Sequence, residues 1–227
     1  MNNISKTRKI ISGLLKVIVF LSAGIGTFLS VYAGRHGFMG GMASFMYFTI
    51  QSNIAIGIIS LIGLCFLIKN SKINNLWLII KFVGTISITL TGVVFGFVLA
   101  PTLGAGAWNI HNTLTHLVVP VAAVIDFFVI MPGHNISRNN VIYVIIPPLL
   151  YAIYARIGYV NGWQFAQGYN YPYFFLNWGS KAGAWGFTKE MPYMGTMWWI
   201  LALLIFLIVI GHIYIGIVRL FEKKKTE

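Results

Sequence analysis

Charged residues are scarce in this chain of 227 residues, and acidic residues are the scarcest. Asp, Glu, Lys and Arg make up 9% of the sequence, and only 4 residues are acidic. A soluble domain carries about a quarter of its residues as charges, so this composition excludes an ordinary soluble enzyme or binding module. With 58% hydrophobic residues and a mean hydropathy of +0.80, the chain is predicted to be an integral membrane protein.

Cysteine is nearly absent, since Cys65 is the only one. One thiol can form neither an internal disulfide nor a cysteine-based metal site. Because Cys65 lies in an apolar run, we expect a buried, inert thiol. The sequence also lacks a Gly-rich phosphate loop, and no two histidines have the i,i+4 spacing that holds zinc on a helix. We therefore expect neither a metal nor a cofactor.

The net charge is +12. A nucleic-acid-binding protein gathers its basic residues on one face. Here Lys and Arg instead cluster at the ends of apolar runs and at both termini. This pattern indicates membrane topology and contact with anionic headgroups, and no nucleic-acid partner.

Six apolar runs are long enough to cross a bilayer, which takes about 20 helical residues. The end of the first run, Val31-Tyr32-Ala33, resembles a signal-peptide cleavage site, but Lys16 inside the run favours a retained helix. The predicted helices span about 8–32, 43–68, 75–99, 109–131, 140–159 and 194–220. The predicted fold is an all-α integral membrane protein, with one six-helix domain over residues 1–227.

Three local features refine this fold. Pro147-Pro148 predicts a kink in the fifth helix. Gly92 and Gly96 form a GxxxG pair, which predicts close packing of the third helix on a neighbour. Residues 160–193, the long connection, are dense in Trp, Tyr and Phe, which prefer the depth of the headgroups. We expect this segment to form an aromatic cap over the bundle.

The orientation follows from the distribution of basic residues. Six spans place both termini and the connections 69–73 and 132–139 on one side of the membrane. The basic residues on that side are Lys6, Arg8, Lys9, Lys69, Lys72, Arg138, Arg219, Lys223, Lys224 and Lys225. The opposite side has Arg35, Arg156, Lys181 and Lys189. The positive-inside rule therefore predicts a multi-pass protein of the cell membrane with both termini cytoplasmic and the cap external.

The second apolar run contains an unusual polar stretch, Tyr47-Phe48-Thr49-Ile50-Gln51-Ser52-Asn53. Each polar side chain within a bilayer needs a partner or costs several kcal/mol, roughly. Such groups either bind neighbouring helices together or line a site. Thr49 lies about six residues, or ~9 Å, below the predicted external end of its helix, and His116 about seven residues, or ~10 Å, below the external end of the fourth. Their depths match.

Asp126 lies ten residues from His116, or ~15 Å along one helix, and cannot complete a triad with it. Asp126 instead matches Lys81 in depth, since both lie five or six residues from the cytoplasmic ends of their helices. Buried charges persist by pairing, so we expect a structural ion pair between them.

A threonine hydroxyl becomes a nucleophile when an adjacent base takes its proton, and a neutral histidine suits that role. Thr49 and His116 therefore form a candidate catalytic dyad. Asn112 lies one turn before His116, and Asn53 lies one turn after Thr49. Either asparagine can orient the imidazole or donate to an oxyanion. Ser52 is an alternative hydroxyl. The competing interpretation is that all these groups form interhelical hydrogen bonds.

These motifs resemble a known family of membrane proteins. Tyr47 to Asn53 (YFTIQSN), His116 with Val119-Pro120 and Asp126 after it, and Tyr171 to Leu176 (YPYFFL) are similar to the androgen-induced gene 1 and androgen-dependent TFPI-regulating protein family, in particular to its bacterial six-helix relatives. The resemblance covers most of the chain in helix order.

Eukaryotic members of that family hydrolyse fatty acid esters of hydroxy fatty acids with an intramembrane Thr and His. The resemblance implies that Thr49 is the nucleophile and His116 the base, with His111 a second candidate for the base. It implies a lipid or fatty acyl ester substrate, whose free carboxylate Arg156, with Tyr171 and Tyr173 of the cap, can hold. The alternatives are a lipid-binding or transport protein without catalysis and a purely structural bundle. The sequence leaves the oligomeric state open.

Overall fold

The computed structural model describes residues 5–34, 41–131 and 136–223. Six helical segments are long and apolar enough to cross a membrane, and the described residues form no strand. The six segments are Lys6–Ala33, Phe48–Ile68, Asn75–Gly106, Ile110–Ile130, Arg138–Val160 and Thr196–Phe221. The prediction of an all-α, multi-pass membrane protein is confirmed at this level.

Several of these spans are composite helices. The first two are the simple helices α1 (Lys6–Ala33) and α2 (Phe48–Ile68), with the short 3-10 helix η2 (Gly41–Met46) between them. The third span comprises α3 (Asn75–Val94), η3 (Phe95–Leu99), α4 (Ala100–Leu103) and η4 (Gly104–Gly106). The fourth comprises α5 (Ile110–Thr113), η5 (Leu114–Val118) and α6 (Val119–Ile130). The last elements are η6 (Arg138–Ile145), α7 (Ile146–Val160), η7 (Phe174–Leu176) and α8 (Thr196–Lys223).

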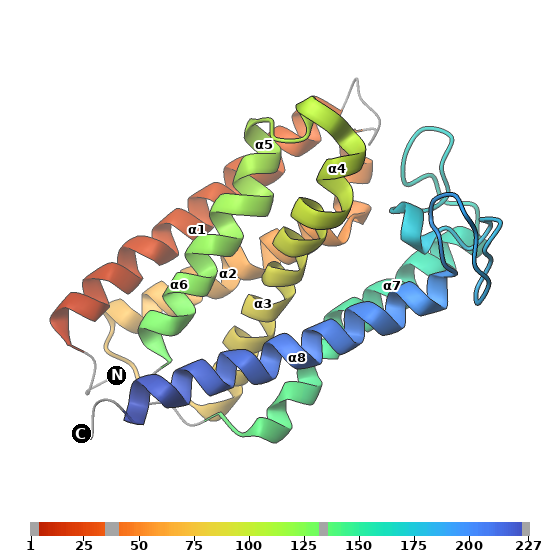
Figure 1. Cartoon of the computed structure of the whole chain (residues 1–227). Helices are drawn as coiled ribbons and strands as arrows, with labels where there is room; N and C mark the ends of the chain where they lie inside the picture. Colours follow the sequence, from red (N-terminus) through yellow and green to blue (C-terminus); the bar gives the residue numbers. More distant parts are fainter. Residues whose placement is uncertain (1–4, 35–40, 132–135, 224–227) are drawn as a thin grey trace.

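The bundle has two packed groups of helices. Helices α1, α2, α3 and α6 pack on one another around a core that includes Val19, Ile56, Ile88 and Val119. Helix α8 and the η6–α7 span pack against the other side of α3. Helix α1 begins and α8 ends at the same end of the bundle, and the aromatic segment between α7 and α8 lies at the opposite end (Figure 1).

The second span begins later than the sequence predicts. Its α-helix starts at Phe48 instead of near Ala43. Gly41 adopts a φ of +61°, and Tyr47 is extended with φ −89° and ψ 139°, so a 3-10 turn and then a break precede the helix. Thr49 is therefore the second residue of α2, which changes the depth at which its hydroxyl lies.

The prolines and glycines have distinct consequences. Pro147 and Pro148 lie in the first turn of α7, where a helix has no internal partner for their missing N–H groups, and the backbone changes there from 3-10 to α. A Cβ on Gly92 would lie 3.0 Å from the His116 carbonyl oxygen, so α3 approaches the fourth span closely at this glycine. Gly96 meets nothing within 4 Å, and only the first glycine of the pair packs tightly.

The expectation that Cys65 is buried needs correction, and some residues of the charge count lie outside the described part of the chain. Cys65 is exposed on α2, a membrane-spanning helix, so its thiol faces the bilayer and the expected burial is wrong. Arg35, Lys224 and Lys225, which contribute to the charge count, lie outside the described residues.

Candidate functional site

A buried charge cluster ties three helices together at the end of the bundle where α1 begins. The Asp126 carboxylate of α6 pairs with Lys81 of α3, which confirms the predicted ion pair. Lys16 of α1 also donates to both carboxylate oxygens, at 2.6 and 2.7 Å. Ser12 completes the cluster by donating to Asp126 Oδ1 at 2.5 Å.

Sequence reasoning missed Lys16, although a signal was present. A lysine inside an apolar span must find a partner, and Asp126 is the single acidic residue within any of the six spans. All three charged side chains are buried, and each of them has a partner. Because one carboxylate joins α1, α3 and α6, the cluster holds these helices in one arrangement and has a structural role.

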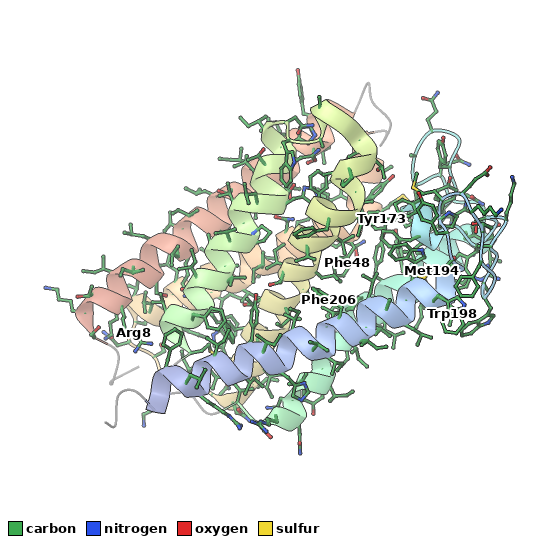
Figure 2. The ribbon with its side chains drawn as sticks, in the orientation of Figure 1. Arg8, Phe48, Tyr173, Met194, Trp198 and Phe206 are labelled. Carbon is green, nitrogen blue, oxygen red and sulfur yellow. The ribbon has the colours of Figure 1, made fainter. Side chains whose placement is uncertain are left out.

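Thr49 lies at the other end of the bundle, against the aromatic segment. Its amide nitrogen donates to the Tyr173 hydroxyl at 3.3 Å, and its own hydroxyl lies 3.4 Å from the same oxygen. That amide has no carbonyl partner within the helix because it belongs to the first turn of α2. Burial raises the pKa of the Tyr173 phenol, which therefore stays protonated and able to donate. Figure 2 shows Tyr173 on the cap side of the bundle near Phe48, far from Arg8.

Two further polar residues of α2, Ser52 and Asn53, anchor Thr49 to its neighbours. Ser52 Oγ and Asn53 Nδ2 both donate to the Thr49 carbonyl, at 3.0 and 2.8 Å. Ser52 Oγ also lies 2.7 Å from Thr91 Oγ1 on α3, and Asn53 Nδ2 also donates to the Thr115 carbonyl of η5 at 3.1 Å. Asn53 therefore binds α2 to the fourth span. Among the described residues it makes no hydrogen bond to the His116 ring, which one of the predicted roles for Asn53 required.

His116 is held in a defined orientation. Its Nδ1 lies 3.1 Å from the Asn112 carbonyl oxygen and 3.0 Å from Thr115 Oγ1. Because a carbonyl can only accept, this geometry assigns the proton to Nδ1 and leaves the lone pair on Nε2. Asn112 thus orients the imidazole through its main chain, whereas its side chain donates to the Ala107 carbonyl. The ring also stacks on Phe95, with 3.8 Å between the ring centroids.

Both residues of this stacked pair lie in π-helical turns, Phe95 in η3 and His116 in η5. Such turns are rare and recur at functional sites because they re-aim side chains. No periodicity in the sequence indicates them, since each inserts within an otherwise apolar helical run.

Thr49 opens onto an apolar cavity of about 60 Å³ between α2, α3, α7, α8 and the aromatic segment. Tyr173, Thr91 and Phe95 also line it, whereas His116 does not. Among the described residues, no hydrogen bond joins Thr49 to His116.

The predicted depth match therefore needs correction. The hydrogen bond from Asn53 Nδ2 to the Thr115 carbonyl places Asn53 at the depth of Thr115, which is next to His116. Thr49 lies four residues before Asn53, or ~6 Å nearer the cap. The late start of α2 at Phe48 is the reason for the difference.

The three residues expected to hold a substrate carboxylate do not form one contact group. Arg156 is exposed, and its guanidinium lies 4.8 Å from the ring centre of Trp178. Tyr171 packs on Tyr169, with ring centroids 5.4 Å apart. In the described part of the chain, no hydrogen bond or ring contact joins Arg156 to Tyr171 or Tyr173. Within that part, no three His, Cys, Asp or Glu side chains gather as a metal site would require.

Comparison of the chain with models of protein families, with curated proteins and with solved structures found no match.

Proposed function

We propose that this protein is an intramembrane lipid ester hydrolase in which Thr49 is the nucleophile and His116 the general base. One observation carries the proposal. The Thr49 hydroxyl, its helix N-terminal amide and the Tyr173 hydroxyl meet within 3.4 Å at the wall of an apolar cavity. A nucleophile with two hydrogen-bond donors beside it is the arrangement that acyl transfer requires. We further propose that the chain is a bacterial-type member of the androgen-induced gene 1 and androgen-dependent TFPI-regulating protein family.

The reaction has two steps. In the first, Thr49 Oγ1 attacks the ester carbonyl carbon while His116 Nε2 takes the hydroxyl proton. The carbonyl oxygen becomes an oxyanion, which the Thr49 amide and the Tyr173 hydroxyl stabilise. The C–O bond to the alcohol then breaks, and the alcohol leaves with the proton from His116. In the second step, water attacks the acyl-Thr49 ester, His116 takes the water proton, and the fatty acid leaves as Thr49 Oγ1 regains that proton.

This chemistry requires His116 Nε2 to approach Thr49 Oγ1 to about 2.6–3.2 Å. Phe95 packs on the imidazole and also lines the cavity, so its displacement by a substrate can open the path between them. Catalytic hydrogen bonds are often long without substrate and tighten in the complex. Phe95 and His116 both lie in π-helical turns, which occur frequently at functional sites.

The proposed orientation places both termini in the cytoplasm, as the basic residues of the connections favour, with the aromatic segment outside. Thr49 then lies toward the outer side of the membrane, and a lipid ester reaches it from within the bilayer. Arg156, exposed at that end, remains a candidate for the carboxylate of such a substrate.

Labelling of the purified protein with a short-chain fluorophosphonate tests the proposal. The probe phosphorus takes the Thr49 oxygen, fluoride leaves, and fragmentation of the labelled peptide distinguishes Thr49 from Ser52. We expect no label in Thr49→Ala and a rate about 10²–10⁴-fold lower in His116→Ala, the usual contribution of a general base.

His111→Ala tests the second candidate for the base. His111 lies five residues away on the same span, but the ring that stacks on the cavity-lining Phe95 is that of His116. His111→Ala should leave the labelling rate within about twofold. Labelling that persists in Thr49→Ala would overturn the assignment. A wild-type protein that retains lipid through purification but takes no label would instead be a lipid-binding or transport protein.

A further inference from the structure

A second, larger cavity of about 470 Å³ lies between α2, α3 and the η6–α7 span. Its size is within the range of small-molecule pockets, about 300–1,000 Å³. Several lining residues are exposed side chains of membrane-spanning helices, among them Ala55, Ile80 and Tyr143. Because exposed residues of a span face lipid, the cavity opens sideways into the bilayer.

The two cavities share a wall. Phe48 lines both of them. Ser52 on the larger cavity is hydrogen-bonded to Thr91 on the smaller one, at 2.7 Å. The Phe48 ring packs edge-on against Tyr151, with 5.3 Å between the centroids, and is half-buried. Phe48 and the hydrogen bond between Ser52 and Thr91 therefore separate the cavity that opens to the bilayer from the cavity at Thr49.

A polar group in the larger cavity has no partner. Ser87 is 6% exposed, and its hydroxyl has no hydrogen bond within the described residues. A buried hydroxyl without a partner in a membrane is unfavourable, so this position favours an occupant that carries a hydrogen-bond acceptor. Bilayer hydrocarbon alone cannot supply one. Ser87 lies one turn, or ~6 Å, from Thr91 along α3.

We propose that the larger cavity is the entry site for a fatty acyl ester. The ester enters sideways from the bilayer, its acyl chain lies along α2 and α3, and its carbonyl oxygen accepts a hydrogen bond from Ser87. The hydroxyls of Ser87, Ser52, Thr91 and Thr49 then lead from the opening to the nucleophile, with Phe48 as the gate. This inference rests on the proposed hydrolase function for the identity of the ester, but not for the location of the chain.

Two probes test the inference on the full chain in lipid nanodiscs. The first is palmitic acid with a diazirine in mid-chain and a terminal alkyne, whose crosslinks are mapped by peptide. It should label the peptides of α2 and α3 that line the cavity. The second is a pair of fluorophosphonates, one with a hexadecyl and one with an ethyl chain, whose labelling rates are compared.

Ala55→Phe fills the cavity, and Ala202→Phe is its matched control, because Ala202 is an exposed alanine of α8 that lines neither cavity. Ala55→Phe should lower the yield of crosslinks to α2 and α3 about tenfold or more. It should lower the ratio of the hexadecyl to the ethyl labelling rate by a similar factor. Ala202→Phe should leave both within about twofold. Val83→Phe, on the opposite wall of the cavity, provides a second filling variant should Ala55→Phe fail to accumulate.

The outcomes separate the two proposals. Crosslinks spread evenly over all lipid-facing helices, or crosslinks that Ala55→Phe and Val83→Phe leave unchanged, would overturn the entry site. Crosslinks confined to the cavity in a protein that neither fluorophosphonate labels would support the acyl site and contradict the hydrolase.

Discussion

Two polar clusters lie at opposite ends of this membrane bundle, and they differ in how well their groups are satisfied. In the cluster of Lys16, Lys81 and Asp126, short charge-assisted bonds of 2.6–2.7 Å join Lys16 to the carboxylate. Around Thr49 the contacts with Tyr173 are 3.3–3.4 Å long, and the buried Asn53 Oδ1 has no partner within the described residues. The first arrangement stabilises the fold, whereas the second leaves polar groups available to a ligand.

Cavities and helix irregularities follow the same division. Both cavities reach the Thr49 end through Phe48, and both π-helical turns lie near His116. The charge cluster lies between regular stretches of α1, α3 and α6. In a membrane protein, a polar residue therefore suggests function when its surroundings are incompletely bonded, and suggests structure when they are complete.

The largest expected effect is on stability, from removal of the shared carboxylate. Asp126→Asn leaves two buried ammonium groups without a counter-ion, and removal of one partner of a buried pair costs about 3–5 kcal/mol. Thermal unfolding of the purified protein measures the loss. Glu190→Gln breaks the exposed pair with Lys181 and is the matched control, with a cost of at most ~1 kcal/mol. Equal effects of the two variants would show that the buried cluster has no special structural role.

The next effect is on the chemistry of the Thr49 end. Tyr173→Phe keeps the ring and its packing on Phe175 but removes the hydroxyl beside Thr49. Loss of one oxyanion donor lowers rates by about 10²–10³-fold, and we expect a decrease of this order in fluorophosphonate labelling. Tyr171→Phe, whose ring packs on Tyr169, serves as the control. An unchanged labelling rate in Tyr173→Phe would remove the phenol from the site.

The contrast between the two clusters also explains what the sequence could predict. Long apolar runs determine the six spans. Because Asp126 is the single acidic residue within those spans, it is the one carboxylate there with which Lys81 can pair. The pair was therefore predictable from matching depth together with the scarcity of acidic residues. Lys16 was not predicted in this cluster, although a charge inside an apolar span needs a partner.

The Thr49 end was predictable only in part. The contact between Thr49 and Tyr173 joins residues 124 positions apart, and Tyr173 lies in an irregular segment whose path no periodicity specifies. The late start of α2 depends on the backbone conformations of Gly41 and Tyr47. A shift of this kind moves every residue counted from the helix end, so depth arithmetic fails where a helix end is irregular.

The smallest expected effect concerns the hydrogen bond between Ser52 and Thr91, which borders both cavities. A double-mutant cycle of Ser52→Ala and Thr91→Val isolates its contribution to the free energy of unfolding. We expect a coupling of about 0.6 kcal/mol, the average for such bonds between membrane helices. Thr102→Val, which removes a local bond to the Leu99 carbonyl, replaces Thr91→Val in the control cycle and should show no coupling with Ser52→Ala. A coupling no larger than that of the control cycle would show that this bond contributes nothing to the wall between the cavities.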